Sequence, residues 1–152
     1  IIYGQTPAAY APFDIHPAFA LKTRIWQIKE VEAGTPISYG PTFHTLRRTR
    51  LAIVPVGFAD GVRRTISNRG SMLVRANMAP LIGMLSSDFS ILDVTDIPEA
   101  AEGDVVTVFG SDGGAELPAS SYADLYPGTV SEVTSAISSR VPRVYLRKGR
   151  AA

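Results

Sequence analysis

The chain has 152 residues, 45% of them hydrophobic and 19% charged, with a formal net charge of +1 and no cysteine. This length and composition allow one folded domain with its own core, exclude disulfides and sulfur-based zinc sites, and give no reason to expect a nucleic-acid partner. No apolar stretch reaches the roughly 20 residues needed to cross a bilayer, so we expect no membrane contact and a cytoplasmic location.

The first segment, residues 1–17, carries one glycine and three prolines among aromatic residues and shows no helical period. This pattern predicts an extended linker. The chain does not begin with methionine, so we expect it to be a segment of a longer protein. Residues 18–152 are predicted to form one domain.

Apolar and polar residues then alternate from 18 to 31, which predicts one long strand. Residues 50–56 form a short apolar run of strand length, and Pro55 predicts that this strand lies at an edge or a bulge. Further strands of similar length, separated by turn residues, are predicted at 71–75, 79–85, 90–94 and 104–109. Many short strands at this spacing predict a mainly β domain, a small closed or nearly closed barrel.

Helical spacing occurs only late in the chain. It predicts two short helices, at 120–126 and 129–139, followed by a final strand at 141–146. The glycine-rich residues 110–114 lack the lysine and the spacing of a phosphate-binding loop, so we interpret them as a hairpin loop.

The residues themselves offer few catalytic candidates. His16 and His44 have no carboxylate or second histidine at a metal-ligand spacing, so no metal site is predicted. Asp60 precedes a glycine, a pattern more typical of turns than of catalytic acids. Tyr39 lies between a serine and a glycine and, without further information, is interpreted as an ordinary half-buried tyrosine.

An ordered set of motifs changes that interpretation. The chain contains Ser-Tyr-Gly at 38–40 and Val-Pro-Val-Gly-Phe-Ala-Asp-Gly at 54–61, and further similar segments follow in order at 67–70, 79–83, 93–98, 103–110 and 140–143. Together these segments resemble the second domain of the alanine racemase family. The resemblance covers nearly the whole chain.

The resemblance implies a two-domain homodimer. An N-terminal (β/α)8 barrel, absent from this chain, would hold pyridoxal 5'-phosphate through a lysine, and this β-domain would reach over the barrel of the partner subunit. Racemisation needs a proton carrier on each face of the α-carbon, and in the family the tyrosine of Ser-Tyr-Gly serves one face. By that match the catalytic residue is Tyr39. The isolated chain is expected to be inactive.

The resemblance also implies substrate contacts and shows departures from the family. Phe58 replaces a tyrosine at the mouth of the site, and residues 86–89 replace Cys-Met-Asp-Gln, with only Asp88 kept. The backbone N–H of Ser87 would contact the substrate carboxylate, and Asp88 would help shape the pocket. Residues 129–132 lack the tyrosine that reaches the cofactor phosphate in the family.

Three interpretations remain open at this stage. The parent protein is a racemase for alanine, serine or another small amino acid, or a racemase paralogue that kept only a dimerisation or binding role. A β-barrel that binds nucleic acid is the third, and the weak charge bias disfavours it.

Overall fold

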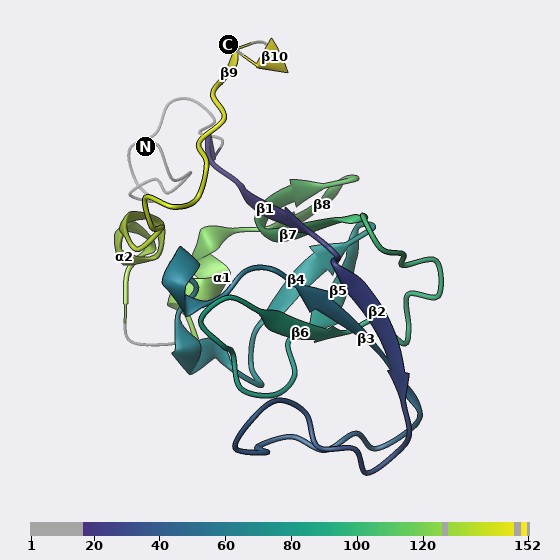
Figure 1. Cartoon of the computed structure of the whole chain (residues 1–152). Coiled ribbons are helices and arrows are strands. Elements are labelled where there is room, and N and C mark those ends of the chain that lie inside the picture. The colour runs from purple at the N-terminus through teal and green to yellow at the C-terminus, as the bar shows by residue number, and fades with distance from the viewer. Residues whose placement is uncertain (1–16, 126–127, 148–149, 152) are drawn as a thin grey trace.

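The computed structural model describes residues 17–125, 128–147 and 150–151, which form mainly short strands with two short helices near the C-terminal end (Figure 1). The predicted fold class is therefore confirmed. The linker predicted over 1–17 lies, apart from Pro17, outside the described residues. The strands are β1 (Leu21–Arg24), β2 (Gln27–Val31), β3 (Thr49–Val54), β4 (Ser71–Val74), β5 (Asn77–Pro80), β6 (Ser90–Asp93), β7 (Val105–Asp112), β8 (Ala115–Leu117), β9 (Leu146–Arg147) and β10 (Arg150–Ala151). The helices are α1 (Ala119–Ala123) and α2 (Val130–Ser135), with 3-10 turns η1 (Phe58–Asp60) and η2 (Arg64–Ile66).

Two antiparallel sheets make up the body of the domain. The larger has the strand order β1-β7-β4-β5, with β8 paired to the end of β7, and the smaller has the order β2-β3-β6. Strands β9 and β10 form a separate ladder. The chain thus passes between the sheets several times, and segments far apart in sequence become neighbours.

The long strand predicted over 18–31 is wrong, because the chain changes sheets in the middle of it. The backbone N–H of Ile25 donates to Asp104 O at 2.9 Å, and the next N–H, of Trp26, donates to Ile53 O at 2.9 Å. β1 therefore pairs with β7 and β2 with β3. The alternation of apolar and polar side chains reports only that the backbone is extended. The change of pairing partner depends on strands that are distant in sequence, so the alternation does not predict it.

The two sheets meet a second time at an isolated bridge between Leu81 and Leu92. The arrangement is barrel-like, as predicted, but within the described residues the hydrogen-bonded ladders do not close a barrel. The strand predicted over 79–85 is also too long: β5 ends at Pro80, and Gly83 turns the chain with φ of +76°. That φ lies in the left-handed region that favours glycine.

Pro55 does not mark an edge strand. β3 lies between β2 and β6 and ends one residue earlier, at Val54, so the proline falls just outside both ladders. The prediction of an edge or a bulge is therefore wrong, because β3 pairs on both sides without a register shift. The lack of an N–H on proline is accommodated because the strand has already ended.

The C-terminal predictions hold only in part. Both helices form but are shorter than predicted, and residues 141–145 form no strand. The guanidinium of Arg143 donates hydrogen bonds to Ile137 O and Val141 O, which ties this segment into a loop. The glycine-rich residues 110–114 do lie at a hairpin, between β7 and β8.

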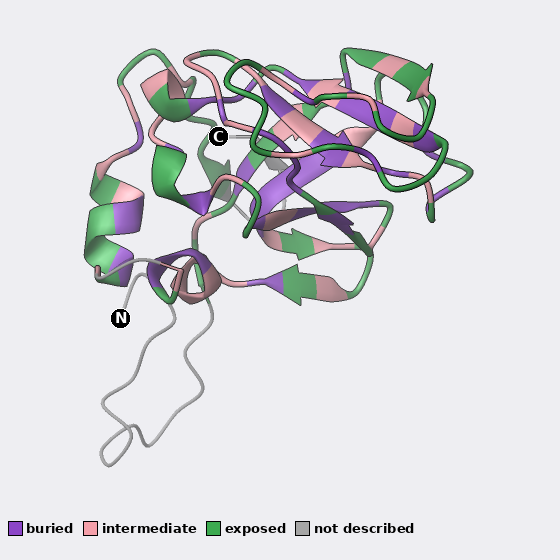
Figure 2. Cartoon of the chain, turned by 90° about the horizontal axis from the view of Figure 1, so that it is seen from below, coloured by how far each residue is buried: buried purple, intermediate pink, exposed green. Residues whose placement is uncertain are grey.

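The core occupies the interior between the sheets and the inner side of the helices. Figure 2 shows buried residues gathered along the strands, while most loops are exposed. Consecutive residues are buried in β4 and β7, so both faces of these strands are covered. Tyr122 of α1 donates its hydroxyl to Ser71 O at 2.8 Å, and burial raises the pKa of this phenol. No helix in the described ranges has the length and apolar character of a membrane span.

Candidate functional site

Four loops contact one another and carry every site residue that the sequence predicted. They are residues 37–42, 57–61, 83–89 and 136–141, called here the loop edge. The contacts include backbone hydrogen bonds, a serine hydroxyl and ion pairs. The loop edge is therefore built by polar links across large separations in sequence.

Tyr39 is exposed, with 57% of its surface accessible. It lies between two residues in the left-handed region, Ser38 with φ of +63° and Gly40 with φ of +60°. A serine in this region is strained, and its hydroxyl compensates by donating to Met84 O at 2.7 Å. Tyr39 thus sits at the tip of a held loop, outside the core of its own domain.

The base of this loop is fixed by apolar and polar contacts. Ile37 is buried together with Leu51 and Ile82. A Cβ on Gly83 would lie only 2.7 Å from Ile37 Cγ2, so the loop approaches Gly83 closely. Asn68 reinforces the contact, because Asn68 Oδ1 accepts from Gly83 N at 2.6 Å and Asn68 Nδ2 donates to Thr42 Oγ1 at 2.9 Å.

Phe58 and Ser87 belong to two segments joined through their backbones. The N–H of Phe58 donates to Ser86 O and the N–H of Ala59 donates to Ser87 O, both at 3.0 Å. A Cβ on Gly57 would lie 2.3 Å from Ser87 O, so only glycine permits this approach. The Phe58 side chain remains 43% exposed beside the turn.

Residues 86–89 form a tight turn. The N–H of Ser86 donates to Phe89 O at 3.0 Å, and the N–H of Phe89 returns a bond to Ser86 Oγ at 2.9 Å. The ring of Phe89 stacks on Trp26, with ring centroids 5.1 Å apart. No hydrogen bond to another described residue uses the Ser87 N–H.

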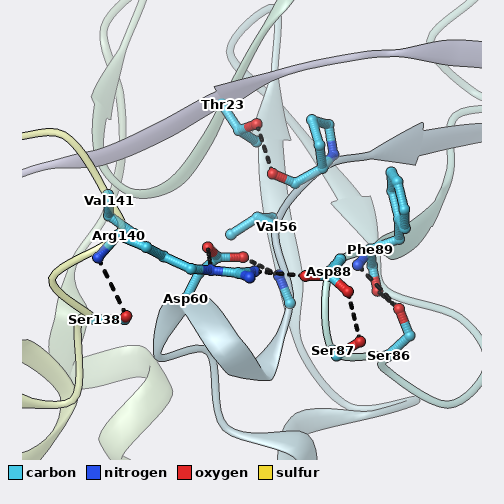
Figure 3. Close-up of polar contacts among 12 residues, drawn as sticks. Thr23, Val56, Asp60, Ser86, Ser87, Asp88, Phe89, Ser138, Arg140 and Val141 are labelled. Carbon is cyan, nitrogen blue, oxygen red and sulfur yellow. Dashed lines mark hydrogen bonds and ion pairs between the residues drawn. The ribbon is translucent and has the colours of Figure 1, made fainter.

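Asp88 is held by the neighbouring serine and by an arginine from the far end of the chain (Figure 3). Ser87 Oγ donates to Asp88 Oδ2 at 2.7 Å, and Arg140 Nη2 lies 2.8 Å from Asp88 Oδ1. These two donors, the serine first, lower the pKa of the Asp88 carboxyl. Asp88 is therefore a charged, partnered group and not a proton donor at neutral pH.

Arg140 also binds Asp60, since its Nε lies 2.8 Å from Asp60 Oδ1. The other oxygen of Asp60 accepts the N–H of Gly57 at 2.8 Å, which confirms the turn role predicted for this aspartate. No motif or spacing in the sequence predicted a role for Arg140, although residues 140–143 are among the segments that carry the resemblance. Its two partners lie 52 and 80 residues away, and no spacing rule connects them.

The segment at 129–132 has a structural role in the absence of a tyrosine. Thr129 N donates to Glu132 Oε2 at 2.6 Å and Glu132 N donates to Thr129 Oγ1 at 3.3 Å, a reciprocal cap that begins α2. These side chains are thereby committed to the helix end.

The loop edge brings together the exposed Tyr39, the turn at 86–89 and the two ion pairs of Arg140. A cavity of about 350 Å³ is lined by residues such as Phe19, Gly110 and Pro118, and none of its described lining residues belongs to the loop edge. The fold is therefore that of a mainly β domain that carries these groups on loops at its surface.

This chain belongs to the alanine racemase C-terminal domain family. The family described as "Alanine racemase, C-terminal domain" matches residues 18–145. The alanine racemase of Desulfosudis oleivorans is 46% identical over 147 residues, which cover 95% of this chain and 38% of the relative. That of Desulfovibrio desulfuricans is 39% identical over 149 residues, covering 96% and 39%. The chain thus spans about two fifths of the length of these relatives.

Solved structures give the same result. The alanine racemase of Bacillus anthracis with bound L-Ala-P matches with a TM-score of 0.89 at 31% identity, covering 98% of this chain and 39% of that one. The alanine racemase of Bartonella henselae with covalently bound pyridoxal phosphate matches with a TM-score of 0.86 at 27% identity, covering 95% and 39%.

Proposed function

We propose that this chain is the C-terminal domain of a pyridoxal-phosphate-dependent racemase acting on alanine or a similarly small amino acid. Family membership and relatives that are alanine racemases support the reaction class. The observation that carries the proposal for this chain is the exposed phenol of Tyr39, held on a strained loop beside a turn with a free N–H.

The residues of the loop edge fit an amino-acid substrate better than the cofactor. A phosphate group needs free cations or several free N–H groups. Here Arg140 is already shared by two carboxylates. We therefore assign the cofactor to a preceding barrel domain. When bound, pyridoxal phosphate would withdraw electrons from the substrate and make its α-proton acidic.

Tyr39 would act as acid and base for one face of the α-carbon. A phenol donates a proton well, and it acts as a base where cations or dipoles stabilise the phenolate. Its hydroxyl oxygen, as the phenolate, would remove the α-proton of one enantiomer. In the reverse direction the phenol would donate a proton to the same face of the α-carbon and so form that enantiomer. A second carrier on the opposite face, which we assign to the cofactor lysine, completes the inversion.

The turn at 86–89 would bind the substrate carboxylate. The free Ser87 N–H is a suitable donor, and a backbone donor does not depend on which side chain stands at this position. Asp88, fixed by its two partners, would set the shape of the pocket. The exposed ring of Phe58 would bound its mouth with an apolar surface.

Exposure of Tyr39 also supports the proposal that it works on another subunit. A phenol that lies outside the core of its own domain can enter a site on a second chain. We therefore propose a homodimer in which each β-domain completes the barrel site of its partner, with no role for nucleic acid or membrane.

The test is replacement of Tyr39 by phenylalanine in the full-length protein. Loss of a positioned acid–base group is expected to lower kcat for racemisation by about 10²–10⁴-fold with the fold intact. Tyr145→Phe is the matched control, because it removes the hydroxyl of an exposed tyrosine outside the loop edge. An unchanged rate for Tyr39→Phe would remove this residue from catalysis.

The isolated chain should show no turnover. Its described site residues include neither a cofactor lysine nor a phosphate site, so added pyridoxal phosphate and alanine should not racemise above the rate of the free cofactor. Polarimetry or a coupled assay for D-alanine measures this directly.

A second function is favoured by the departures from the family. Phe58 lacks a hydroxyl, and residues 129–132 are occupied in capping α2. A paralogue that kept only dimerisation or binding would tolerate both changes. Cofactor absorbance and racemase activity in the wild-type full-length protein favour the enzyme, and their absence favours the binding role.

A further inference from the structure

We propose that Arg140 is a positioning residue that holds the carboxylate-binding turn in place and neutralises the acidic group beside it. This inference rests on the proposed function, in which the Ser87 N–H binds the substrate carboxylate. It goes further because it assigns a role to a residue that would not touch the substrate.

The guanidinium of Arg140 joins two of the loops that form the loop edge. Its Nε lies 2.8 Å from Asp60 Oδ1 and its Nη2 lies 2.8 Å from Asp88 Oδ1 (Figure 3). Arginine suits such a bridge because the N–H donors of its planar guanidinium point in different directions and can bind two carboxylates at once. Lysine has a single ammonium group that acts as a point charge. One side chain thus links η1 to Asp88 of the 86–89 turn, in addition to the backbone hydrogen bonds between the two segments.

Arg140 is itself anchored at its backbone. The preceding residues contact the 57–61 loop, since the Ser138 N–H donates to Asp60 O at 3.1 Å. A Cβ on Gly61 would lie 2.3 Å from Ala136 O. Arg143 Nη2 donates to Ile137 O at 2.8 Å. The guanidinium therefore extends from a loop fixed by these contacts, and its ion pair restrains the position of Asp88.

Charge gives the bridge a second effect. A substrate carboxylate at the Ser87 N–H would lie next to the ionised side chain of Asp88, and two like charges at short range repel. The guanidinium of Arg140 forms an ion pair with the Asp88 carboxylate, and Ser87 Oγ also donates a hydrogen bond to this carboxylate. Without the arginine, the negative charge of Asp88 would oppose the binding of any carboxylate at this turn.

A purely structural brace predicts a different result. If Arg140 only stabilised the domain, its loss would lower the free energy of unfolding and the fraction of active protein. KM would then stay unchanged. Removal of the Asp88 charge would then restore nothing. The positioning role instead predicts a change in KM that depends on the charge of Asp88.

The experiment measures kcat and KM of the full-length protein in both directions for Arg140→Gln, Arg140→Lys and the double variant Arg140→Gln/Asp88→Asn. We expect Arg140→Gln to raise KM on the order of tenfold, with a smaller change in kcat. Arg140→Lys, which keeps the charge but not the fork, should recover part of the loss. The double variant should reverse most of the increase in KM that comes from the unpaired charge of Asp88.

Arg47→Gln is the matched control, because it breaks another exposed arginine–aspartate pair, with Asp96, outside the loop edge. An unchanged KM in Arg140→Gln, or equal KM values in the single and double variants, would overturn the proposal.

A readout independent of activity separates this proposal from the proposed function. Amide hydrogen exchange of the peptide covering 86–89 should become faster in Arg140→Gln and stay unchanged in Arg47→Gln, since the Ser86 and Phe89 amides are hydrogen-bonded within the turn. If the wild-type protein lacks racemase activity, the proposed function fails while the exchange result still tests the bridge. Unchanged exchange would contradict the positioning role.

Discussion

The strands at the centre of the domain and the loop edge are stabilised in different ways. The consecutive residues Met72, Leu73 and Val74 in β4 and Val108 and Phe109 in β7 are at most 2% exposed, so these strands are held by apolar contact on both faces. The loop edge instead leaves its Tyr39 ring exposed and relies on hydrogen bonds, close glycine contacts and the Arg140 bridge.

Because the strands are held by apolar burial and the loop edge by polar links, we expect substitutions in the two regions to affect stability and the proposed activity differently. Removal of an apolar group from the strands should cost stability wherever it is buried. Removal of a polar link from the loop edge should cost little stability but should move a group that binds or reacts. Substitutions in the two regions can therefore be ranked by their effect on unfolding and compared with their effect on activity.

The largest loss of stability is expected in the strands. Leu92 of β6 is completely buried, and Leu92→Ala should lower the free energy of unfolding by about 2–5 kcal/mol through lost burial and a cavity. Leu46, 93% exposed, is the control, and Leu46→Ala should change stability by less than about 0.5 kcal/mol. Urea denaturation followed by circular dichroism measures both. Equal effects would contradict the assignment of the core.

Gly61→Ala should give the next largest effect. Gly61 has φ of +106°, and an added Cβ would lie 2.3 Å from Ala136 O, so the substitution combines backbone strain with a clash against backbone. We expect a loss of about 1–3 kcal/mol together with a raised KM, because the segment that carries Arg140 is pushed away. Gly103→Ala, also at positive φ but with open space around its Cβ, separates strain from the clash.

Asn68→Ala should cost about 1 kcal/mol, because it removes the acceptor of the Gly83 N–H and the donor to Thr42. A larger relative loss is expected in kcat, since the loop that carries Tyr39 loses part of its base. If kcat were unchanged while stability fell, Asn68 would only support the fold.

The smallest effect is on acid stability. A hydrogen bond from Arg75 and another from the Ala101 N–H lower the pKa of Asp104 below its ordinary value near 4. A carboxyl with a lowered folded-state pKa contributes stability above its unfolded pKa and loses that contribution as the pH falls through the folded pKa. Asp104→Asn should therefore flatten the fall in stability below about pH 4 and matter less at pH 2 than at pH 7. A thermal melt series across this range measures the slope.

The sequence was informative where structure depends on neighbours along the chain. The apolar runs at 71–75, 90–94 and 104–109 correspond to β4, β6 and β7, since each run is bounded by turn residues. The change of sheet at Ile25 could not be predicted, because it depends on pairing with Asp104 and with β3. Local alternation is the same whether a strand keeps or changes its partner.

The site was predicted only as far as the resemblance extends. Tyr39 and Ser87 were predicted as site residues from family motifs, and no periodicity in the chain singled them out. Arg140 was missed, because its role depends on two loops that the fold brings together from distant positions. A polar bridge of this kind leaves no pattern in sequence, whereas a buried strand does.

The central claim, that Tyr39 serves the active site of the partner subunit, is tested most directly by mixed dimers. One subunit carries Tyr39→Phe, and the other lacks the cofactor-binding lysine of the barrel domain that we propose to precede this chain. Each variant alone should be inactive. After random reassociation half of the dimers are mixed, and each would hold one complete site out of two, so the activity should recover to about a quarter of the wild-type value. No recovery, with mixed dimers demonstrated by mass spectrometry, would contradict the account.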